Sequence, residues 1–318
     1  MSNCLELKLI SKKKMNVFKR RKILVTHPGG FHADDLFATA VLSIVFDGHV
    51  KIIRTSDPEI IAKADFVYDI GLVYDPETNR FDHHQKEGAG QRENGIPYAS
   101  FGLVWKKYGE QICGSKEVAD RIDRKIVQPI DASDNGVDIS KPIFPGINRR
   151  GVEKLFLDEA PTWKEDRKNI DNIFIKQSKE VKKFLLREVK ISKDEEEGCQ
   201  IIMNGYRNAS DKRIIILDIS LPRNLYQDTL AMLPEPVYAL MPGGDNKSWK
   251  IEAIIKSIGT KESRKPFPEN WRGLTNGDER LQAVTGVSDV IFCHRNGFTM
   301  QAVSKESAIA LAEKALIA

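Results

Sequence analysis

The chain has 318 residues and carries 49 Lys and Arg against 45 Asp and Glu, which gives a formal net charge of +4. With 41% hydrophobic and 30% charged residues, it is neither collagen-like, nor a low-complexity chain, nor a small disulfide-rich secreted scaffold. Its length suits two domains with separate cores, it has no apolar run long enough to span a membrane, and its net charge is too small to identify a nucleic-acid binder.

The N-terminal stretch is basic and has no apolar core of signal-peptide length, so we expect a basic tail over residues 1–21. The four cysteines lie far from one another in the sequence, and no CxxC motif is present. They are Cys4, Cys113, Cys199 and Cys293. Because such spacing favours reduced thiols, we expect a cytoplasmic protein without a membrane anchor.

Strand and helix signals alternate through the first half of the chain. A short apolar run at residues 23–26 predicts a buried strand, and apolar residues 36–46 predict a helix that begins near Asp34 or Asp35. Further strands are predicted at residues 50–54, 66–70 and 80–82, and helices at 100–108 and 116–130. This alternation favours a largely parallel sheet with helices on both faces.

The second half begins with a charged amphipathic helix predicted for residues 163–189, which ends at a polar stretch over 193–198. We expect a hinge near residues 190–205. Strands are predicted at 213–219, 237–241, 249–255 and 290–293, and a closing helix at 304–317. The sequence therefore predicts an α/β protein with a first domain over residues 22–200, which includes a helical connector, and a smaller second α/β domain over 201–318.

Histidines and carboxylates gather in four segments of the first half. The segments are His27-Pro-Gly-Gly-Phe-His32-Ala-Asp34-Asp35, Asp69, Asp82-His83-His84 and Asp131-Ala-Ser-Asp134-Asn135-Gly136. His27, Asp69 and His83 each follow a predicted strand, and the carboxyl ends of parallel strands form sites at one edge of a sheet. Imidazole and carboxylate ligands without thiolate suit Mn²⁺ or Mg²⁺ better than zinc or iron.

Single members of this set have simpler interpretations. Asp34 or Asp35 alone fits a helix N-cap, and the run from Asp134 to Gly136 alone fits a turn. The dense segments around His27 and His83 are hard to explain as caps, so the combined set predicts a metal centre. Two closely spaced ions need a bridging carboxylate, and together they activate water and neutralise phosphoryl charge.

Seven short motifs in a fixed order give the chain a family resemblance. They are THPGGFHADD, VYDIG, RFDHHQ, YASFGLVW, DASDNG, PFPENWRGL and FCHRNGF. Together they resemble the melanocyte-proliferating-gene (MYG-type) family within the DHH phosphoesterase superfamily. The resemblance implies a parallel-sheet DHH-type metal domain and a 3′–5′ RNA exonuclease activity. In the first motif, His32 stands where the superfamily usually has an aspartate.

The resemblance also assigns roles to individual residues. One ion would be held by His27, His32, Asp69 and Asp131, and the other by Asp34, Asp69 and His83, with Asp131 as a further candidate. Asp69 would bridge two ions, Mn²⁺ or Mg²⁺. Asp82 would orient His83, and His84 would face the phosphate as a donor or acid.

In the superfamily, a smaller domain supplies cationic groups to the substrate. The candidates in this chain are Arg264, Lys265, Trp271, Arg272 and His294. The planar fork of an arginine binds phosphate through two hydrogen bonds, and a tryptophan stacks on a base. The simpler interpretation is a solvated arginine and a packed tryptophan.

Three functions remain open from the sequence. We favour a metal-dependent phosphodiesterase, a 3′–5′ exonuclease on RNA or short single-stranded nucleic acid that uses metal-activated water. A hydrolase of a small phosphate compound, such as pyrophosphate, a dinucleotide or a phosphosugar, would use the same site. The third is a non-catalytic, metal-stabilised protein that binds nucleic acid. The expected partner is RNA or a short single strand, with no membrane, and an oligomer is compatible with the sequence.

Overall fold

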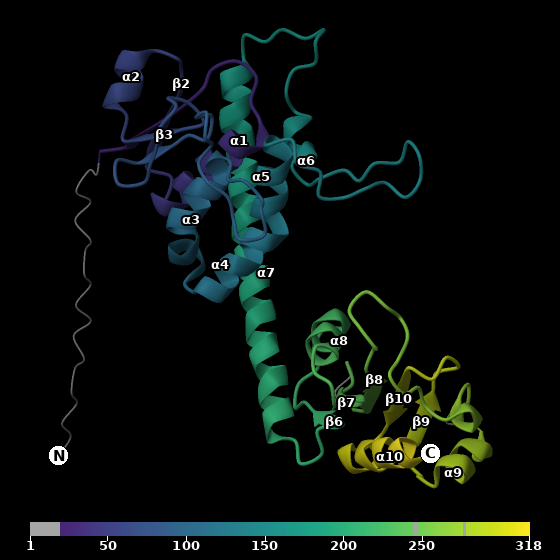
Figure 1. Cartoon of the computed structure of the whole chain (residues 1–318). Coiled ribbons are helices and arrows are strands. Elements are labelled where there is room, and N and C mark those ends of the chain that lie inside the picture. The colour runs from purple at the N-terminus through teal and green to yellow at the C-terminus, as the bar shows by residue number, and fades with distance from the viewer. Residues whose placement is uncertain (1–19, 245–246, 276–277) are drawn as a thin grey trace, which may run out of the picture. The chain divides into compact units, whose positions relative to one another are not determined.

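The computed structural model describes residues 20–244, 247–275 and 278–318 (Figure 1). Residues 1–19 of the predicted basic tail lie outside the described residues. The chain divides into two compact units between Ser192 and Lys193. Each unit contains one five-stranded sheet together with helices, which confirms the predicted α/β fold.

The sheet of the first unit has the strand order β2-β1-β3-β5-β4. Its strands are β1 (Lys22–Thr26), β2 (Val50–Arg54), β3 (Phe66–Tyr68), β4 (Tyr74–Asp75) and β5 (Arg80–Phe81). Strand β1 is parallel to β2 and β3, β3 is parallel to β5, and β4 alone pairs antiparallel. The carboxyl ends of four parallel strands therefore share one edge of the sheet.

Helices cover both faces of this sheet, as the run of buried residues in β1 indicates. The helical elements are α1 (Ala33–Val45), α2 (Pro58–Lys63), α3 (Ser100–Cys113), α4 (Lys116–Ile122), the π-helix η1 (Asp123–Val127), α5 (Gln128–Asp134) and α6 (Lys154–Leu157). Leu24 belongs to the core formed with α1 and α3, whereas its neighbour Val25 packs in a smaller cluster with α2. Successive residues of a strand point to opposite faces, so an apolar β1 is buried on both sides.

Helix α7 (Ile170–Asn208) has 39 residues and corrects the prediction of a break after residue 189. The polar stretch at 193–198 and the whole of the predicted hinge at 190–205 lie inside the helix. Lysine and glutamate are good helix formers, so a polar composition does not end a helix. Gly198 fits because a Cβ at this position would collide with the side chain of Leu225.

The second unit has the strand order β6-β7-β8-β10-β9, with β6 parallel to β7 and every other neighbouring pair antiparallel. Its elements are β6 (Ile214–Ile216), α8 (Arg223–Ala231), β7 (Tyr238–Pro242), β8 (Trp249–Ala253), the 3₁₀ helix η2 (Glu269–Trp271), α9 (Glu279–Thr285), β9 (Val290–Cys293), β10 (Thr299–Ala302) and α10 (Lys305–Ile317). Leu240 packs with α10, and Met241 packs with α8. Among the residues described in both units, no helix combines the length and apolarity needed to cross a membrane.

Candidate metal centre

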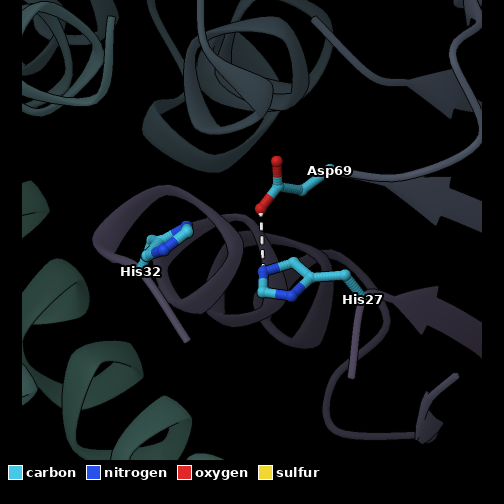
Figure 2. Close-up of side chains that lie close together, drawn as sticks. All are labelled: His27, His32 and Asp69. Atoms are coloured by element: carbon cyan, nitrogen blue, oxygen red, sulfur yellow. Dashed lines mark ion pairs between the residues drawn. The ribbon is translucent and has the colours of Figure 1, made fainter. Parts of the chain in front are cut away.

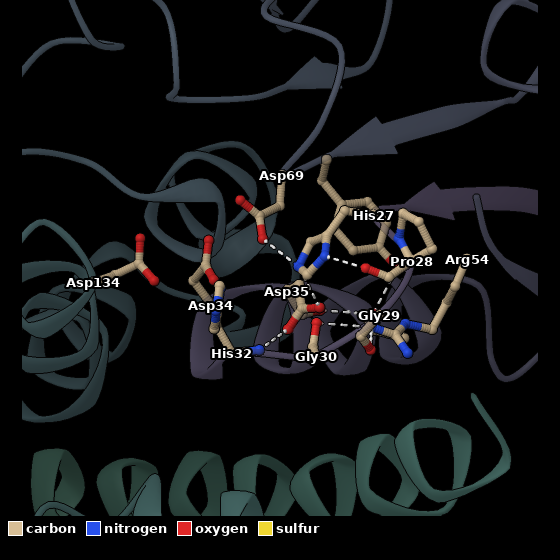
Figure 3. Close-up of polar contacts among 12 residues, drawn as sticks. His27, Pro28, Gly29, Gly30, His32, Asp34, Asp35, Arg54, Asp69 and Asp134 are labelled. Atoms are coloured by element: carbon tan, nitrogen blue, oxygen red, sulfur yellow. Dashed lines mark hydrogen bonds and ion pairs between the residues drawn. The ribbon is translucent and has the colours of Figure 1, made fainter. Parts of the chain in front are cut away.

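The histidine and carboxylate segments meet at the carboxyl edge of the first sheet (Figure 3). His27 follows β1, Asp69 follows β3 and Asp82 follows β5. The N-terminus of α1 adds Asp34 and Asp35 from the side. Because these strands are parallel, segments that are up to about a hundred residues apart in the chain reach a common edge.

His27 points its Nε2 atom at two carboxylates. This nitrogen lies 3.2 Å from Oδ2 of Asp35 and 3.2 Å from Oδ2 of Asp69, and Figure 2 shows the second contact. The other ring nitrogen, Nδ1, lies 3.0 Å from the carbonyl oxygen of Pro28. A carbonyl only accepts, so in the neutral ring Nδ1 carries the proton and Nε2 offers a lone pair to a metal.

His83 makes the matching contacts on the other side of Asp69. Its Nε2 lies 3.2 Å from Oδ2 of Asp134, 3.5 Å from Oδ1 of Asp69 and 3.7 Å from Oδ2 of Asp34. Asp69 therefore turns one oxygen toward His27 and the other toward His83. This is the position that a bridging carboxylate needs.

The backbone of Asp69 has a φ of +56°, in the left-handed region that non-glycine residues rarely occupy. Such a conformation costs roughly 1–2 kcal/mol for a residue with a Cβ, although Asp tolerates it better than most. Strained residues of this kind gather at functional sites, where the surrounding structure holds them. The strain at Asp69 coincides with the carboxylate that both histidines share.

The loop between His27 and His32 is held by a buried arginine that the sequence did not single out. The guanidinium of Arg54 donates to the carbonyl oxygens of Gly29 at 3.0 Å and Gly30 at 3.2 Å, and to Oδ1 of Asp171 at 2.7 Å. Gly29 has a φ of +85°, which glycine adopts without strain. Arg54 thus fixes the turn that carries His27 out of β1.

The carboxylates control the protonation of both buried histidines. Burial lowers the pKa of His27, but the contacts with Asp35 and Asp69 outweigh it and raise the pKa to about 10. Burial likewise opposes charge on His83, yet Asp134 and Asp69 raise its pKa to about 10. Without a metal, the site therefore holds protons where cations would otherwise bind.

The pKa values of the carboxylates depend on the same contacts. Burial raises the pKa of Asp69, but the two histidines outweigh it and hold the pKa at about 2. Burial, and then the charges of Asp69 and Asp134, raise the pKa of Asp34 well above its usual range. Neighbouring carboxylates in a buried site repel one another unless cations lie between them.

Unsatisfied polar atoms provide the test of whether a metal fits. Seven buried side-chain atoms in this cluster have no hydrogen-bond partner outside the cluster among the described residues, and their contacts with one another need protonated histidines: Nε2 of His27 and His83, both carboxylate oxygens of Asp34 and Asp69, and Oδ2 of Asp35. Leaving one such group unsatisfied costs about 1–3 kcal/mol, more for a charged group. A cation would satisfy these atoms at once, and imidazole with carboxylate is a set that Mn²⁺ and Mg²⁺ accept.

Four groups of three side chains could hold a metal ion, with all ligand atoms in a group within 4.8 Å of one another. They are His27, His32 and Asp69; Asp69, His83 and His84; His32, Asp34 and Asp134; and Asp34, Asp35 and Asp69. Asp69 belongs to three of the four groups. Of the predicted ligands, the structure thus brings together His27, His32, Asp34, Asp69 and His83, and it adds Asp35, His84 and Asp134 as candidates.

Asp131, the remaining predicted ligand, lies elsewhere. Its Oδ2 is 2.8 Å from a guanidinium nitrogen of Arg92, and its Oδ1 accepts from the backbone N–H of Gly102 at 3.0 Å. Burial raises the pKa of Asp131 to about 7 against the opposing effect of Arg92. Asp134, one helical turn further along α5, is the carboxylate that reaches His83.

Gly102 and Arg92 explain why Asp131 is held away from the metal cluster. A Cβ at Gly102 would overlap the carboxylate of Asp131, so the first turn of α3 can approach only without a side chain here. Arg92 also bonds both carboxylate oxygens of Asp123, in η1, at 3.1 and 2.8 Å. Asp131 therefore anchors α5 between a loop and the N-terminus of α3, and this sets the position of Asp134.

Asp82 and His84 form a separate pair at the rim. Oδ1 of Asp82 accepts from the backbone N–H groups of His83 and His84 and lies 2.8 Å from Nδ1 of His84. Its Oδ2 accepts from the N–H of Leu72 at 2.6 Å. Asp82 thus orients the ring of His84, while it contacts His83 only through the backbone. The side chain of His84 is 54% exposed, which leaves it accessible to a substrate.

The candidates in the second unit each have a partner within that unit. Arg264 donates to the carbonyl oxygens of Ala231, Pro234 and Pro236, Lys265 to that of Leu316 and Arg272 to that of Phe267. Trp271 is 4% exposed and packs in the core, which leaves little of its ring for a base. Nδ1 of His294 accepts from the N–H of Asn296. Carbonyl bonding and packing of this kind carry no signal in a single sequence.

Comparison with known proteins covers both units. A family model named for the MYG1 exonuclease and described as an uncharacterised protein family (UPF0160) matches residues 23–316. The MYG1 exonuclease of Bos taurus is 27% identical over 92% of this chain and 84% of its own length. The human MYG1 exonuclease is 26% identical over 92% and 85%, and a MYG1 protein of Chlamydia pneumoniae is 29% identical over 89% and 92%.

Proposed function

This chain belongs to the MYG1 exonuclease family, and from that premise we propose that it is a metal-dependent exonuclease acting on RNA or short single-stranded nucleic acid. The observation that supports the proposal is the set of unsatisfied histidine and carboxylate atoms around Asp69. A 3′–5′ direction and membership of the DHH phosphoesterase superfamily are part of the proposal, on the strength of the sequence resemblance.

The proposed metals are two Mn²⁺ or Mg²⁺ ions. His27, His32 and Asp69 would hold one, while Asp34, His83 and Asp134 would hold the other together with Asp69. When bound, the ions would activate a water molecule and neutralise charge on the phosphoryl group. In this proposal Asp134 replaces Asp131 as a ligand, because Asp131 is already paired with Arg92.

His84 is the side chain that we propose contacts the substrate. Its Nδ1 lies against Asp82, so Nε2 is the nitrogen left to face a phosphate oxygen or a leaving group, and it donates a proton when both ring nitrogens are protonated. Asp82 fixes the ring and favours the proton on Nδ1, as carboxylates do for histidines at metal sites. In our proposal Asp82 positions the ring of His84, and His84 donates a proton to the substrate.

An assay with three substrates tests the proposal. Purified protein would be incubated with Mn²⁺ and end-labelled RNA, end-labelled DNA or pyrophosphate, and its metal content measured beforehand. We expect mononucleotides to be released stepwise from the 3′ end of RNA. Phosphate release from pyrophosphate alone would favour a hydrolase of small phosphate compounds, and bound RNA that is never cleaved would favour the non-catalytic alternative. Fractionation of cells that express the tagged protein tests the predicted cytoplasmic location.

A further inference from the structure

A long exposed segment follows directly after Asp134. Every residue from Gly136 to Arg150 is exposed, and Figure 1 shows the chain between α5 and α6 as a loop that stands away from the helices of the first unit. We call residues 137–150 the exposed arm. Loops of this length without secondary structure are uncommon in compact domains and often have a function.

Several large apolar side chains of the exposed arm are accessible to solvent. Ile143 is 89% exposed, and Phe144 and Ile147 are each 69% exposed. Scattered exposed apolar residues are ordinary, but several in one segment mark an interaction site. Pro142 and Pro145 flank Ile143 and Phe144, and because proline fixes φ, this part of the arm loses less conformational entropy on binding.

The charge of the exposed arm is positive. Lys141, Arg149 and Arg150 lie in a stretch from residue 139 to 152 that contains no carboxylate. Arg150 pairs with Asp158, whereas Lys141 and Arg149 have no ion pair within the described part of the chain. An aromatic ring among unpaired cations is the composition that binds single-stranded nucleic acid, through base stacking and phosphate contacts.

Both ends of the exposed arm are fixed to elements that carry the candidate metal ligands. At its start, Gly136 has a φ of +69° and the N–H of Val137 donates to the carbonyl oxygen of Ala132 at 2.7 Å, which closes α5 beside Asp134. After its end, the ring of Phe156 in α6 lies 5.7 Å from that of Phe37 in α1, the helix that bears Asp34 and Asp35. The arm therefore leaves from and returns to the surroundings of the metal centre.

We propose that the exposed arm binds the single-stranded part of the substrate that leads away from the metal centre. Phe144 stacks on a base, and Lys141 and Arg149 contact phosphates. Phe144 is ten residues beyond Asp134 (144 − 134), a chain length that reaches at most about 36 Å. This upper bound allows the arm to contact nucleotides several positions away from the scissile bond. The inference rests on the proposed nuclease function.

Steady-state kinetics of the full chain with Mn²⁺ test the proposal. The substrates are an RNA of about a dozen nucleotides and the small diester bis(p-nitrophenyl) phosphate, which is too short to reach the arm. For Phe144→Ala we expect KM for RNA to rise at least about fivefold, the lower end of the loss of one base stack, with kcat unchanged. Hydrolysis of the small diester should not change.

The cations are tested through the salt dependence of binding. Anisotropy of labelled RNA in EDTA gives Kd without turnover. For Lys141→Gln combined with Arg149→Gln, we expect the slope of log Kd against log salt to fall by about 1.4, because each phosphate contact to a single strand contributes about 0.7. The control is Met232→Ala, at an equally exposed apolar residue of the second unit. This substitution should leave the kinetic constants for both substrates and the salt slope unchanged.

Each contrary result has a distinct meaning. Unchanged KM and unchanged slope in the arm variants overturn the proposal. An equal loss of activity on RNA and on the small diester also overturns it, since the arm would then act by stabilising the metal centre. A change in sedimentation with unchanged KM assigns the arm to contact between copies of the chain and overturns it too. If the wild type with bound Mn²⁺ cleaves neither substrate, the proposed function fails, and the anisotropy measurement still tests the arm alone.

Discussion

The titratable side chains of the two units differ in their hydrogen-bond partners. At the sheet edge of the first unit, buried histidine and carboxylate atoms have no hydrogen-bond partner outside their own cluster among the described residues. In the second unit, Arg264, Lys265 and Arg272 donate to backbone carbonyl oxygens of their own unit. Buried polar groups are normally satisfied, so unsatisfied ones indicate a missing ligand. The second unit has single neutral atoms without a partner, Oη of Tyr238 and Oγ1 of Thr299, whereas the first unit gathers histidine and carboxylate atoms at one edge, which favours a ligand there.

The largest effect is expected from Asp69→Asn. Asparagine tolerates the left-handed backbone of this position, so the fold should persist while one charge is lost. Since Asp69 is shared by three candidate ligand groups, activity on RNA should fall by more than about a hundredfold, beyond the range seen for outer positioning residues. Rates would be measured with saturating Mn²⁺, and circular dichroism would confirm folding. Wild-type activity in this variant would contradict the proposed centre.

Two matched substitutions on α5 distinguish the proposed metal ligand, Asp134, from the residue that anchors the helix, Asp131. Asp134→Asn should weaken Mn²⁺ binding by at least about a hundredfold, the upper end of the range for residues that only position ligands, with little change in thermal stability. Asp131→Asn should instead cost about 3 kcal/mol of stability, because it breaks a buried ion pair with Arg92. Calorimetric titration and thermal unfolding of both variants make the comparison. Loss of Mn²⁺ binding in Asp131→Asn together with normal binding in Asp134→Asn would contradict the assignment of Asp134 as a ligand.

A smaller effect is expected from Asp82→Asn, which affects the orientation of His84. An amide has one acceptor oxygen and no charge, so it cannot serve both the Oδ1 contacts with His84 and the Oδ2 contact with the N–H of Leu72, and kcat should fall about tenfold. Metal content should stay at the wild-type level, because Asp82 is in none of the candidate ligand groups. Loss of metal together with activity would show that Asp82 supports the ligands instead.

The smallest effect is a gradual dependence of stability on pH. In metal-free protein, the pKa values of His27 and His83 are raised to about 10. Their contribution to stability is complete below the unfolded pKa of about 6.5 and is lost as pH rises through about 10. Thermal unfolding in EDTA should therefore show stability falling over this range, and Mn²⁺ should reduce the dependence. An equal slope with and without Mn²⁺ would argue against shared ligands.

The sequence indicated which histidine and carboxylate segments meet at the sheet edge, because their position depends on local signals. Parallel strands that end in His27, Asp69 and Asp82 place polar residues at one edge whatever the details of packing. The choice between Asp131 and Asp134 depends on contacts with Gly102 and Arg92, 29 and 39 residues before Asp131. Such non-local packing is not visible in a single sequence. The same holds for Trp271, whose burial depends on the core of the second unit.

Helix α7 illustrates the opposite error, in which a local signal was given too much weight. A run of charged residues around Glu195 suggested an end, yet its residue types favour helix. Gly198 is destabilising by about 1 kcal/mol in an isolated helix, but here it allows Leu225 of α8 to pack closely. Tertiary packing therefore accommodates this glycine inside the helix, which continues to Asn208.

Calorimetric titration of metal-free protein with Mn²⁺ tests the central claim most directly. The account predicts that the wild type binds two ions per chain with release of protons from His27 and His83, and that Asp69→Asn weakens both binding events. Proton release is measured by repeating the titration in buffers of different ionisation enthalpy. Identical binding curves for the wild type and Asp69→Asn, or no binding by a folded wild type, would contradict it.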